Sequence, residues 1–373
     1  MPTIPVTHAL RAVPFTQVTV DDLFWTPRLR ANREHTLPAQ YRHCRDTGRL
    51  DAFALAWQPG DPREPHIFWD SDVAKWVEAA SYALCTHTDT GMLDTLNSVA
   101  ELIASAGQSD GYLNTHYTAV EPDKRWSNLR DCHELYCAGH LIEAAVAHFQ
   151  ATGSRVLLDA MCRYADYIGI VFGTGAGQRP GYCGHEEIEL ALVKLAGVTG
   201  ETRYRDLAAY FIDQRGQQPH YFDTEAVARG ENPADYWAKT YAYCQADRPV
   251  RELATVAGHA VRAMYLYSAM TDLAARGDAT LRPALDRLWD DVTLKKLYLT
   301  GGLAETDGIH GDAEQPVNIG LLAGVEAFTL DLPGKGLQSC FAGNHLPQLL
   351  IRIARRRFDV NDPGSHGKCP FLR

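Results

Sequence analysis

The feature that most constrains this chain is a pattern that occurs four times: a run with apolar residues at helical spacing, a short turn containing glycine, and a second such run. The turns contain Gly91, Gly153, Gly200 and Gly277. Two helical runs joined by a short turn predict a helical hairpin. One hairpin cannot bury its apolar face alone, so successive hairpins must pack on one another. Because the spacing between these glycines is uneven, the pattern excludes a tight solenoid and favours a toroid of hairpins whose loops differ in length.

The periodic runs predict a chain built from helices, beginning near residue 28. The residues before about position 25 alternate in part and could form a short strand or an edge segment. Asp70, Ser71 and Asp72 are expected to cap the first clear helix, and Asp131 to cap a helix that begins near Cys132. Roughly nine or ten helices precede residue 300, close to the twelve of an (α/α)6 barrel, with the last pair expected after residue 320. The clearest helical runs lie at 73–85, 93–106, 129–150, 156–170, 187–196, 204–214, 251–275 and 281–297.

Composition and charge argue against several classes of protein. The 373 residues carry a formal net charge of −10 and form no basic stripe before residue 350, which argues against a nucleic-acid partner. No apolar stretch approaches the ~20 residues that span a bilayer, and the first residues lack the cationic start and apolar core of a signal peptide. Nine cysteines without a disulfide spacing pattern indicate reduced thiols. We therefore expect a cytoplasmic protein that neither enters a membrane nor binds nucleic acid.

Three histidines lie where long polar loops are expected to end and helices to begin. His133, His185 and His259 are expected at the starts of three different inner helices, so we expect their imidazoles to converge at the end of the barrel opposite the glycine turns. Each has a plainer interpretation: His133 bonds a neighbouring carbonyl, His259 is a core histidine, and the carboxylates after His185 complement a helix dipole. His133 also lies four residues before Cys137, the spacing of a metal pair on one helix face, with a buried core thiol as the alternative.

Aromatic and polar residues accompany these histidines at the same predicted end. The same arrangement of loops is expected to place Trp69, Asp70 and Tyr112 at this end. Aromatic planes stack on the C–H faces of sugars, while His and Asp side chains match hydroxyl groups. The sequence has no Walker A loop, no dinucleotide-binding fingerprint and no Gly-x-Ser-x-Gly elbow. A small carbohydrate is therefore the expected ligand.

At these positions the sequence resembles glycoside hydrolase family 127, the β-L-arabinofuranosidase-type enzymes, over residues 15–305. The resemblance implies an (α/α)6 barrel followed by β-sandwich domains. It also implies that His133, His185 and His259 match the family's substrate-pocket histidines. The strings that carry it, in the family's order, are FWDSDVAKWVEAA at 68–80, DGYLNT at 110–115, NLRD at 128–131, HELYCAGH at 133–140, GHEEIE at 184–189, GHAVRA at 258–263 and YLTGG at 298–302.

The resemblance implies a retaining reaction in which a zinc-held cysteine thiolate attacks the anomeric carbon and a glutamic acid protonates the leaving oxygen. Zinc coordination would keep the thiol ionised near neutral pH. Glu326, in a Glu-Ala-Phe string, resembles the family's acid, with Glu314 as a rival. Cys340 falls where a zinc-binding Glu-x-Cys should be, but Gln338 replaces the glutamate and no Cys-Cys pair follows. The nucleophile therefore has no candidate residue, and Cys340 is the one metal ligand that the resemblance suggests.

We interpret the chain as an all-α glycosidase-like domain over residues 1–320, with an aberrant, poorly packed segment at 321–373 and without the family's β-sandwich domains. The leading hypothesis is a retaining glycoside hydrolase that releases terminal β-L-arabinofuranose or a related sugar, impaired because its zinc and thiolate site is incomplete. The alternatives are a non-catalytic sugar-binding remnant and an (α/α)6 sugar epimerase or isomerase. Apolar helix faces left uncovered by an incomplete toroid would favour aggregation or a homodimer.

Overall fold

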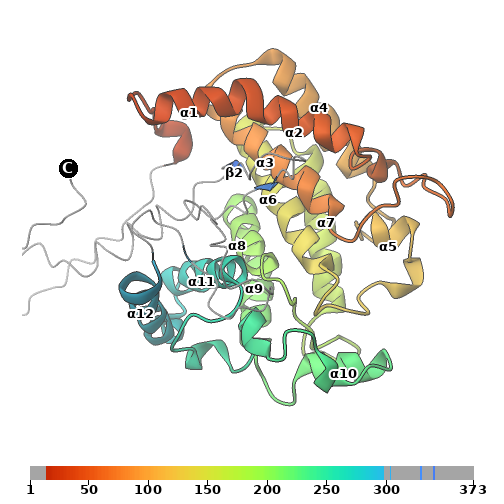
Figure 1. The fold of residues 1–373 in the computed structure, drawn as a ribbon, viewed down its shortest axis with the longest axis vertical. Coiled ribbons are helices and arrows are strands. Elements are labelled where there is room, and N and C mark those ends of the chain that lie inside the picture. Colours follow the sequence, from red (N-terminus) through yellow and green to blue (C-terminus); the bar gives the residue numbers. More distant parts are fainter. Residues whose placement is uncertain (1–13, 298–302, 304–327, 330–338, 341–373) are drawn as a thin grey trace, which may run out of the picture.

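The computed structural model describes residues 14–297, 303, 328–329 and 339–340, and helices provide most of the regular structure in them (Figure 1). Helix α1 (Trp25–Ala31) continues through a π-helical segment into α2 (Leu37–Asp46). Strands β1 (Phe328–Thr329) and β2 (Ser339–Cys340) pair in antiparallel fashion. The other helices are α3 (Trp69–Thr86), α4 (Thr90–Ser105), α5 (His116–Ala119), α6 (Glu134–Thr152), α7 (Val156–Val171), α8 (Ile188–Thr199), α9 (Thr202–Gln214), α10 (Tyr221–Ala228), α11 (Ala260–Ala275) and α12 (Arg282–Asp291).

Four helical hairpins follow one another, each made of an inner and an outer helix. The pairs are α3–α4, α6–α7, α8–α9 and α11–α12, and the inner helices α3, α6, α8 and α11 pack on one another in chain order (Figure 1). The turns after α6 and α8 contain Gly153 and Gly200 in the left-handed conformation, which suits a residue without Cβ. The helical-hairpin architecture of an (α/α)6 barrel, expected from the repeated pattern, is confirmed.

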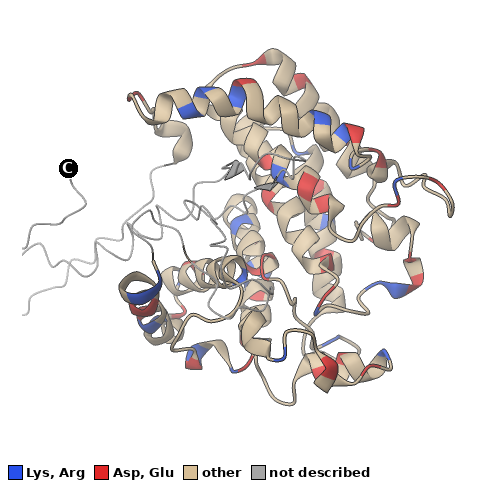
Figure 2. Cartoon of the chain, viewed as in Figure 1, with Lys and Arg blue, Asp and Glu red and all other residues tan. Residues whose placement is uncertain are grey.

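Inner and outer helices differ in how they are buried. Helix α6 is buried along almost its whole length, and α8 over most of it, because α6 is surrounded by α3, α7 and α8. Outer helix α12 buries Ala284, Leu285 and Leu288 while Arg282 and Asp286 pair on its exposed side. Charged residues of both signs are interspersed along the continuous helical stretch from α1 to α2, taken as a whole, and in the loops (Figure 2). Among the described helices, none is both long and apolar enough to span a bilayer.

The predicted helix starts need correction in three places. Helix α6 begins at Glu134 with His133 as its N-cap, so the prediction that Asp131 caps it is wrong. Helix α11 begins only at Ala260, nine residues later than predicted. Helix α3 begins at Trp69, which places Asp70 and its neighbours in the first turn instead of before it. Residues 14–24 contain a 3-10 turn and no strand.

Long-range hydrogen bonds explain the late start of α6. The backbone N–H groups of Leu129 and Arg130 donate to the Glu225 carboxylate, at 2.7 and 3.3 Å. Glu225 lies on α10, almost a hundred residues further along the chain. Because a distant side chain satisfies these donors, the segment 129–133 stays non-helical although its apolar residues fit a helical period. The conformation of the loop before α6 therefore depends on long-range contacts, which the spacing of apolar residues in the sequence cannot predict.

Candidate functional site

The inner helices begin at one common end of the barrel, and long loops lead into each of them. Phe68 is the N-cap of α3, His133 of α6 and His259 of α11, while His185 precedes the first residue of α8 by three positions. The N-termini of helices carry partial positive charge and unpaired N–H groups, which favour oxygen-rich ligands. We call this end the mouth of the barrel.

The three histidines form a row at the mouth. The ring centroids of His133 and His185 are 5.6 Å apart, and those of His185 and His259 are also 5.6 Å apart. The predicted convergence of the three rings is confirmed. Tyr136 lies beneath the row with its ring centroid 4.3 Å from that of His185, and Tyr265 lies 6.3 Å from the same ring. The row and these two rings form a cluster of side chains that we call the histidine cup.

Backbone contacts fix how each imidazole is protonated when it is neutral. The Nδ1 atoms of His133 and His185 lie 2.8 and 3.1 Å from the carbonyl oxygens of Asp131 and Glu186. A carbonyl oxygen can only accept, so each Nδ1 carries a proton and each Nε2 is an acceptor. In His259, Nδ1 instead accepts the N–H of Arg262 at 3.5 Å, so its Nε2 is a donor. Two acceptors and one donor suit hydroxyl groups, which can both donate and accept.

Close backbone packing holds the His133 and His185 loops together. The Gly184 N–H donates to the Leu129 carbonyl at 2.9 Å. A Cβ at position 184 would lie 1.9 Å from the Arg130 carbonyl oxygen, so the approach requires glycine. Arg262 of α11 donates to the Gly184 carbonyl at 3.0 Å. The loops that precede α6 and α8 are thus tied to each other and to α11, which fixes the spacing of the row.

A buried arginine supports the His185 loop from below. Arg215 is fully buried and pairs with Glu186 at 3.1 Å and with Glu189 at 2.9 Å. Burial raises the pKa of Glu186 to about 7, although Arg215 opposes this shift. Glu186 lies two residues before α8 instead of in its first turn, as the alternative interpretation had it, and its carboxylate is an internal partner of Arg215.

Asp70 and Tyr112, predicted as substrate contacts, have internal partners in this structure. The Asp70 carboxylate accepts from the N–H of Thr115 at 2.9 Å and from its hydroxyl at 2.6 Å, which ties the loop before α5 to the start of α3. Tyr112 has no exposed surface, and its hydroxyl donates to Glu134 at 2.6 Å. Trp69 lies with its ring 5.0 Å from the Arg49 guanidinium. These residues hold the mouth in shape, and a direct contact with substrate stays a prediction.

A second group of polar residues lies deeper in the barrel. His140, Glu143 and Glu187 place one ligand atom each within 4.8 Å of one another and are all buried. The Lys194 ammonium, however, pairs with Glu143. Burial alone would lower the pKa of Lys194, but Glu143 and a second carboxylate raise it. An ammonium therefore already supplies positive charge where a metal ion would sit, so this cluster is a poor fit for zinc.

The resemblance assigns none of the described thiols the role of the zinc-bound nucleophile. Burial raises the pKa of Cys137 and Cys183 well above its usual value and that of Cys244 to about 12, so without a bound metal these thiols are protonated at neutral pH. Cys137 donates to the Ile67 carbonyl at 3.5 Å, which fits the core-thiol alternative better than a metal pair with His133. Glu314, Glu326 and the side chain of Cys340 lie outside the described residues, as does the boundary predicted near residue 320.

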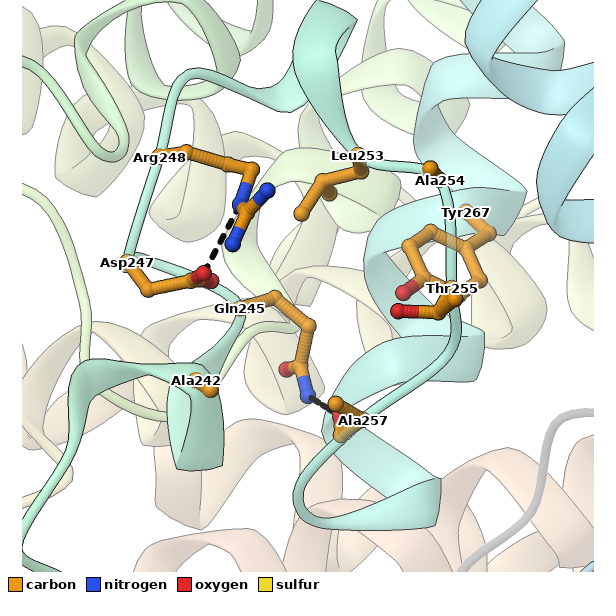
Figure 3. A pocket seen from close by; sticks show the side chains of 9 residues that line it. All are labelled: Ala242, Gln245, Asp247, Arg248, Leu253, Ala254, Thr255, Ala257 and Tyr267. Atoms are coloured by element: carbon orange, nitrogen blue, oxygen red, sulfur yellow. Dashed lines mark hydrogen bonds and ion pairs between the residues drawn. The ribbon is translucent and has the colours of Figure 1, made fainter.

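A small cavity of about 40 Å³ lies beside the start of α11, and none of the three histidines lines it (Figure 3). Asp247 and Arg248 pair at 2.8 Å on one side of it. The Tyr267 hydroxyl and the Gln245 Oε1 are buried there without a hydrogen-bond partner among the described residues. This volume suits a few water molecules. It is too small for a sugar ring, so the mouth remains the candidate carbohydrate site.

Several aromatic residues at the mouth were not predicted from the sequence. Phe68 lies with its ring centroid 5.8 Å from that of His133, and Tyr243 lies 5.8 Å from His259. The N-cap position that identifies His133 and His259 also identifies Phe68. Tyr243 sits in the long loop between α10 and α11, where no periodic signal marks it.

The fold and the mouth together define an (α/α)6-barrel protein whose candidate ligand site lies at the start of its inner helices. The chain belongs to the family described as β-L-arabinofuranosidase, GH127 catalytic domain, whose sequence model matches residues 17–331.

Comparison with individual proteins supports membership of this family. The chain is 41% identical over 249 residues to a non-reducing end β-L-arabinofuranosidase of Bifidobacterium longum subsp. longum, covering 64% of this chain and 38% of that protein. It is similar in structure to a GH127 β-L-arabinofuranosidase from Geobacillus stearothermophilus T6, with a TM-score of 0.75 and 50% identity over 78% of this chain and 47% of that one. A second GH127 β-arabinofuranosidase gives a TM-score of 0.69 at 40% identity, over 78% and 45% of the two chains. This chain thus spans less than half the length of these relatives.

Proposed function

We propose that this chain forms the sugar-binding barrel of a retaining glycoside hydrolase that releases terminal β-L-arabinofuranose. The observation that carries the proposal is the row of His133, His185 and His259, with its two acceptors and one donor at the mouth. In this proposal the row orients the hydroxyls of one furanose ring, and Tyr136 packs beneath it. The family membership and the names of the relatives support the choice of sugar.

The proposal assigns no step to zinc. When bound, zinc would hold a cysteine as the thiolate nucleophile, and the resemblance identifies no cysteine of this chain for that role. Glu326 remains the proposed acid and Glu314 its rival, both by resemblance. The incomplete zinc motif around Cys340 supports the further proposal that turnover by this chain is impaired.

Binding of methyl β-L-arabinofuranoside, measured by calorimetry, tests the sugar site. We expect saturable binding that His185→Ala weakens by roughly tenfold, since it removes a hydrogen-bond acceptor from a site built to use it. His87→Ala is the matched control, because His87 is exposed at the other end of α3 and should leave binding unchanged. Equal binding by wild type and His185→Ala would contradict the proposal.

A non-catalytic sugar-binding protein is the second candidate, favoured by Gln338 in the position where the resemblance expects a zinc-binding glutamate. Release of nitrophenol from nitrophenyl β-L-arabinofuranoside, with zinc content measured on the same sample, separates the two. Robust turnover with one zinc per chain would favour the hydrolase and overturn the proposed impairment. Sugar binding without turnover would favour the second candidate.

A further inference from the structure

We propose that Trp237 is the platform for the sugar ring that is attached to the terminal arabinofuranose, which makes it the leaving-group subsite at the rim of the histidine cup. This inference rests on the proposed function, because it takes the cup as the site of the terminal ring. It adds a second ring to the ligand and names the side chain on which that ring stacks.

Contacts on two sides place Trp237 beside the cup. Its indole N–H donates to the Asp131 carboxylate at 3.2 Å, and the Asp131 carbonyl accepts from Nδ1 of His133 at 2.8 Å. On the other side, its ring centroid is 4.8 Å from that of Tyr243, which in turn is 5.8 Å from His259. One residue therefore separates Trp237 from each of the two outer histidines of the row.

The surroundings of Trp237 hold it in place. Tyr236, Ala238 and Tyr243 form a small apolar cluster of their own, separate from the main core. The Arg130 guanidinium lies 4.5 Å from the Tyr236 ring and pairs with Asp131 at 2.9 Å. The segment that carries Trp237 is thus fastened to the His133 loop by stacking and by charge. A side chain fixed before binding loses little conformational entropy when a ligand stacks on it.

The exposure of Trp237 suits a stacking ligand. It keeps 45% of its surface exposed, although its polar atom already has a partner. An indole ring presents a large apolar face that matches the C–H face of a sugar. Phe68, 39% exposed, flanks His133 with their ring centroids 5.8 Å apart. A terminal furanose held by the cup must continue into its leaving group past this rim, where Trp237 lies.

The experiment compares a one-ring and a two-ring ligand, methyl β-L-arabinofuranoside and a β-L-arabinofuranosyl-L-arabinose, by calorimetry on the full chain. Trp237→Ala should weaken binding of the disaccharide by about threefold to tenfold and change binding of the methyl glycoside by less than twofold. Trp237→Phe keeps an aromatic face and should restore part of the loss. Trp25→Ala is the matched control, because Trp25 is 47% exposed on α1 and its ring packs on Phe24. Circular dichroism checks that each variant is folded.

The possible outcomes separate this inference from the proposed function. Equal losses for both ligands in Trp237→Ala, or no loss for either, would overturn the subsite while leaving the cup in place. A wild-type chain that binds the methyl glycoside as tightly as the disaccharide would overturn it as well. A wild-type chain that binds neither ligand would overturn both proposals.

Discussion

At the scale of single residues, Glu134 shows hydrogen bonding and burial acting in opposite directions. Its carboxylate oxygens accept from the Tyr112 hydroxyl at 2.6 Å and from the Trp126 N–H at 2.7 Å. Both bonds favour the charged form, yet the side chain is almost fully buried. Burial is the larger effect and raises the pKa of Glu134 to about 8. At neutral pH the folded state therefore holds a proton that the unfolded chain, with its ordinary glutamate, has released.

This proton makes folding stability depend on pH in a defined direction. A raised pKa in the folded state stabilises it fully below the ordinary value of 4.5, and the contribution is lost as the pH rises through about 8. For Glu134 the difference is at most about 5 kcal/mol. Glu134→Gln keeps one acceptor for Trp126 and one donor for Tyr112, so we expect its unfolding free energy to fall less between pH 5 and 9. Urea unfolding at several pH values measures this.

Glu121→Gln is the control for this experiment. Lys124 lowers the pKa of Glu121, so this residue contributes in the opposite sense and its removal should leave the fall above pH 5 in place. An identical pH dependence in wild type and Glu134→Gln would contradict the prediction. Other buried carboxylates, such as Glu186, act in the same direction as Glu134, so some pH dependence should remain in the variant.

Prediction from sequence works for some site residues and not for others, for a physical reason. His133, His185 and His259 can be predicted because each lies beside a helix start that periodicity locates approximately. Tyr112 cannot be recognised as buried, because its contact with Glu134 joins a loop to a helix that packs against it only in the folded chain. Trp237 lies in a loop without a periodic signal, and its neighbour Asp131 is 106 residues away in the chain.

At the scale of elements, the existence of the helices is predictable, but the starts of α6 and α11 are not. The spacing of apolar residues locates α3, α4, α6 and α7, and most ends of these helices lie within a few residues of the predicted positions. The start of α6 depends on Glu225, which takes the backbone N–H groups of Leu129 and Arg130. The start of α11 follows Gly258, whose φ of +74° ends the preceding loop. Both features result from tertiary contacts or local backbone conformation, which a helical pattern does not contain.

Close packing of α6 on α8 gives a prediction at this scale. A Cβ on Gly139 of α6 would lie 2.6 Å from Cγ of Glu187 and 2.9 Å from the backbone nitrogen of Ile188. Alanine favours helix over glycine by about 1 kcal/mol, but the overlap should outweigh this gain. We expect Gly139→Ala to destabilise the protein by about 1–3 kcal/mol and to weaken sugar binding, because Glu187 directly precedes α8 and lies two residues after His185. Thermal unfolding and calorimetry measure the two effects.

Gly169→Ala is the matched control, since it is the same substitution inside a helix. Its Cβ would meet only Leu207 Cδ2, at an ordinary 3.7 Å. The helix preference of alanine should then dominate and raise stability by up to about 1 kcal/mol. Stabilisation by both substitutions would show that α6 and α8 can separate without cost, contrary to the packing described.

At the scale of the whole molecule, a buried charge cluster joins three inner helices. Lys194 of α8 pairs with Glu143 of α6 and lies 3.9 Å from Glu78 of α3. All three side chains are largely buried. Burial, together with the neighbouring Glu143, raises the pKa of Glu78 to about 7. An ammonium between carboxylates therefore adds to the apolar packing that joins these helices.

Replacing this ammonium with an apolar side chain of similar length should destabilise the entire barrel in a pH-dependent manner. Lys194→Met leaves buried carboxylates without their shared cation, and breaking such a pair costs about 3–5 kcal/mol. We expect this loss, measured by urea unfolding, to be larger at pH 8 than at pH 5.5, because protonated carboxyls need no counter-charge and Glu78 can take up a proton at the lower pH. Lys124→Met, which removes an exposed ammonium from Glu121, should cost no more than about 1 kcal/mol at either pH. A loss in Lys194→Met that is equally small, or independent of pH, would mean that apolar contacts alone hold α3, α6 and α8 together.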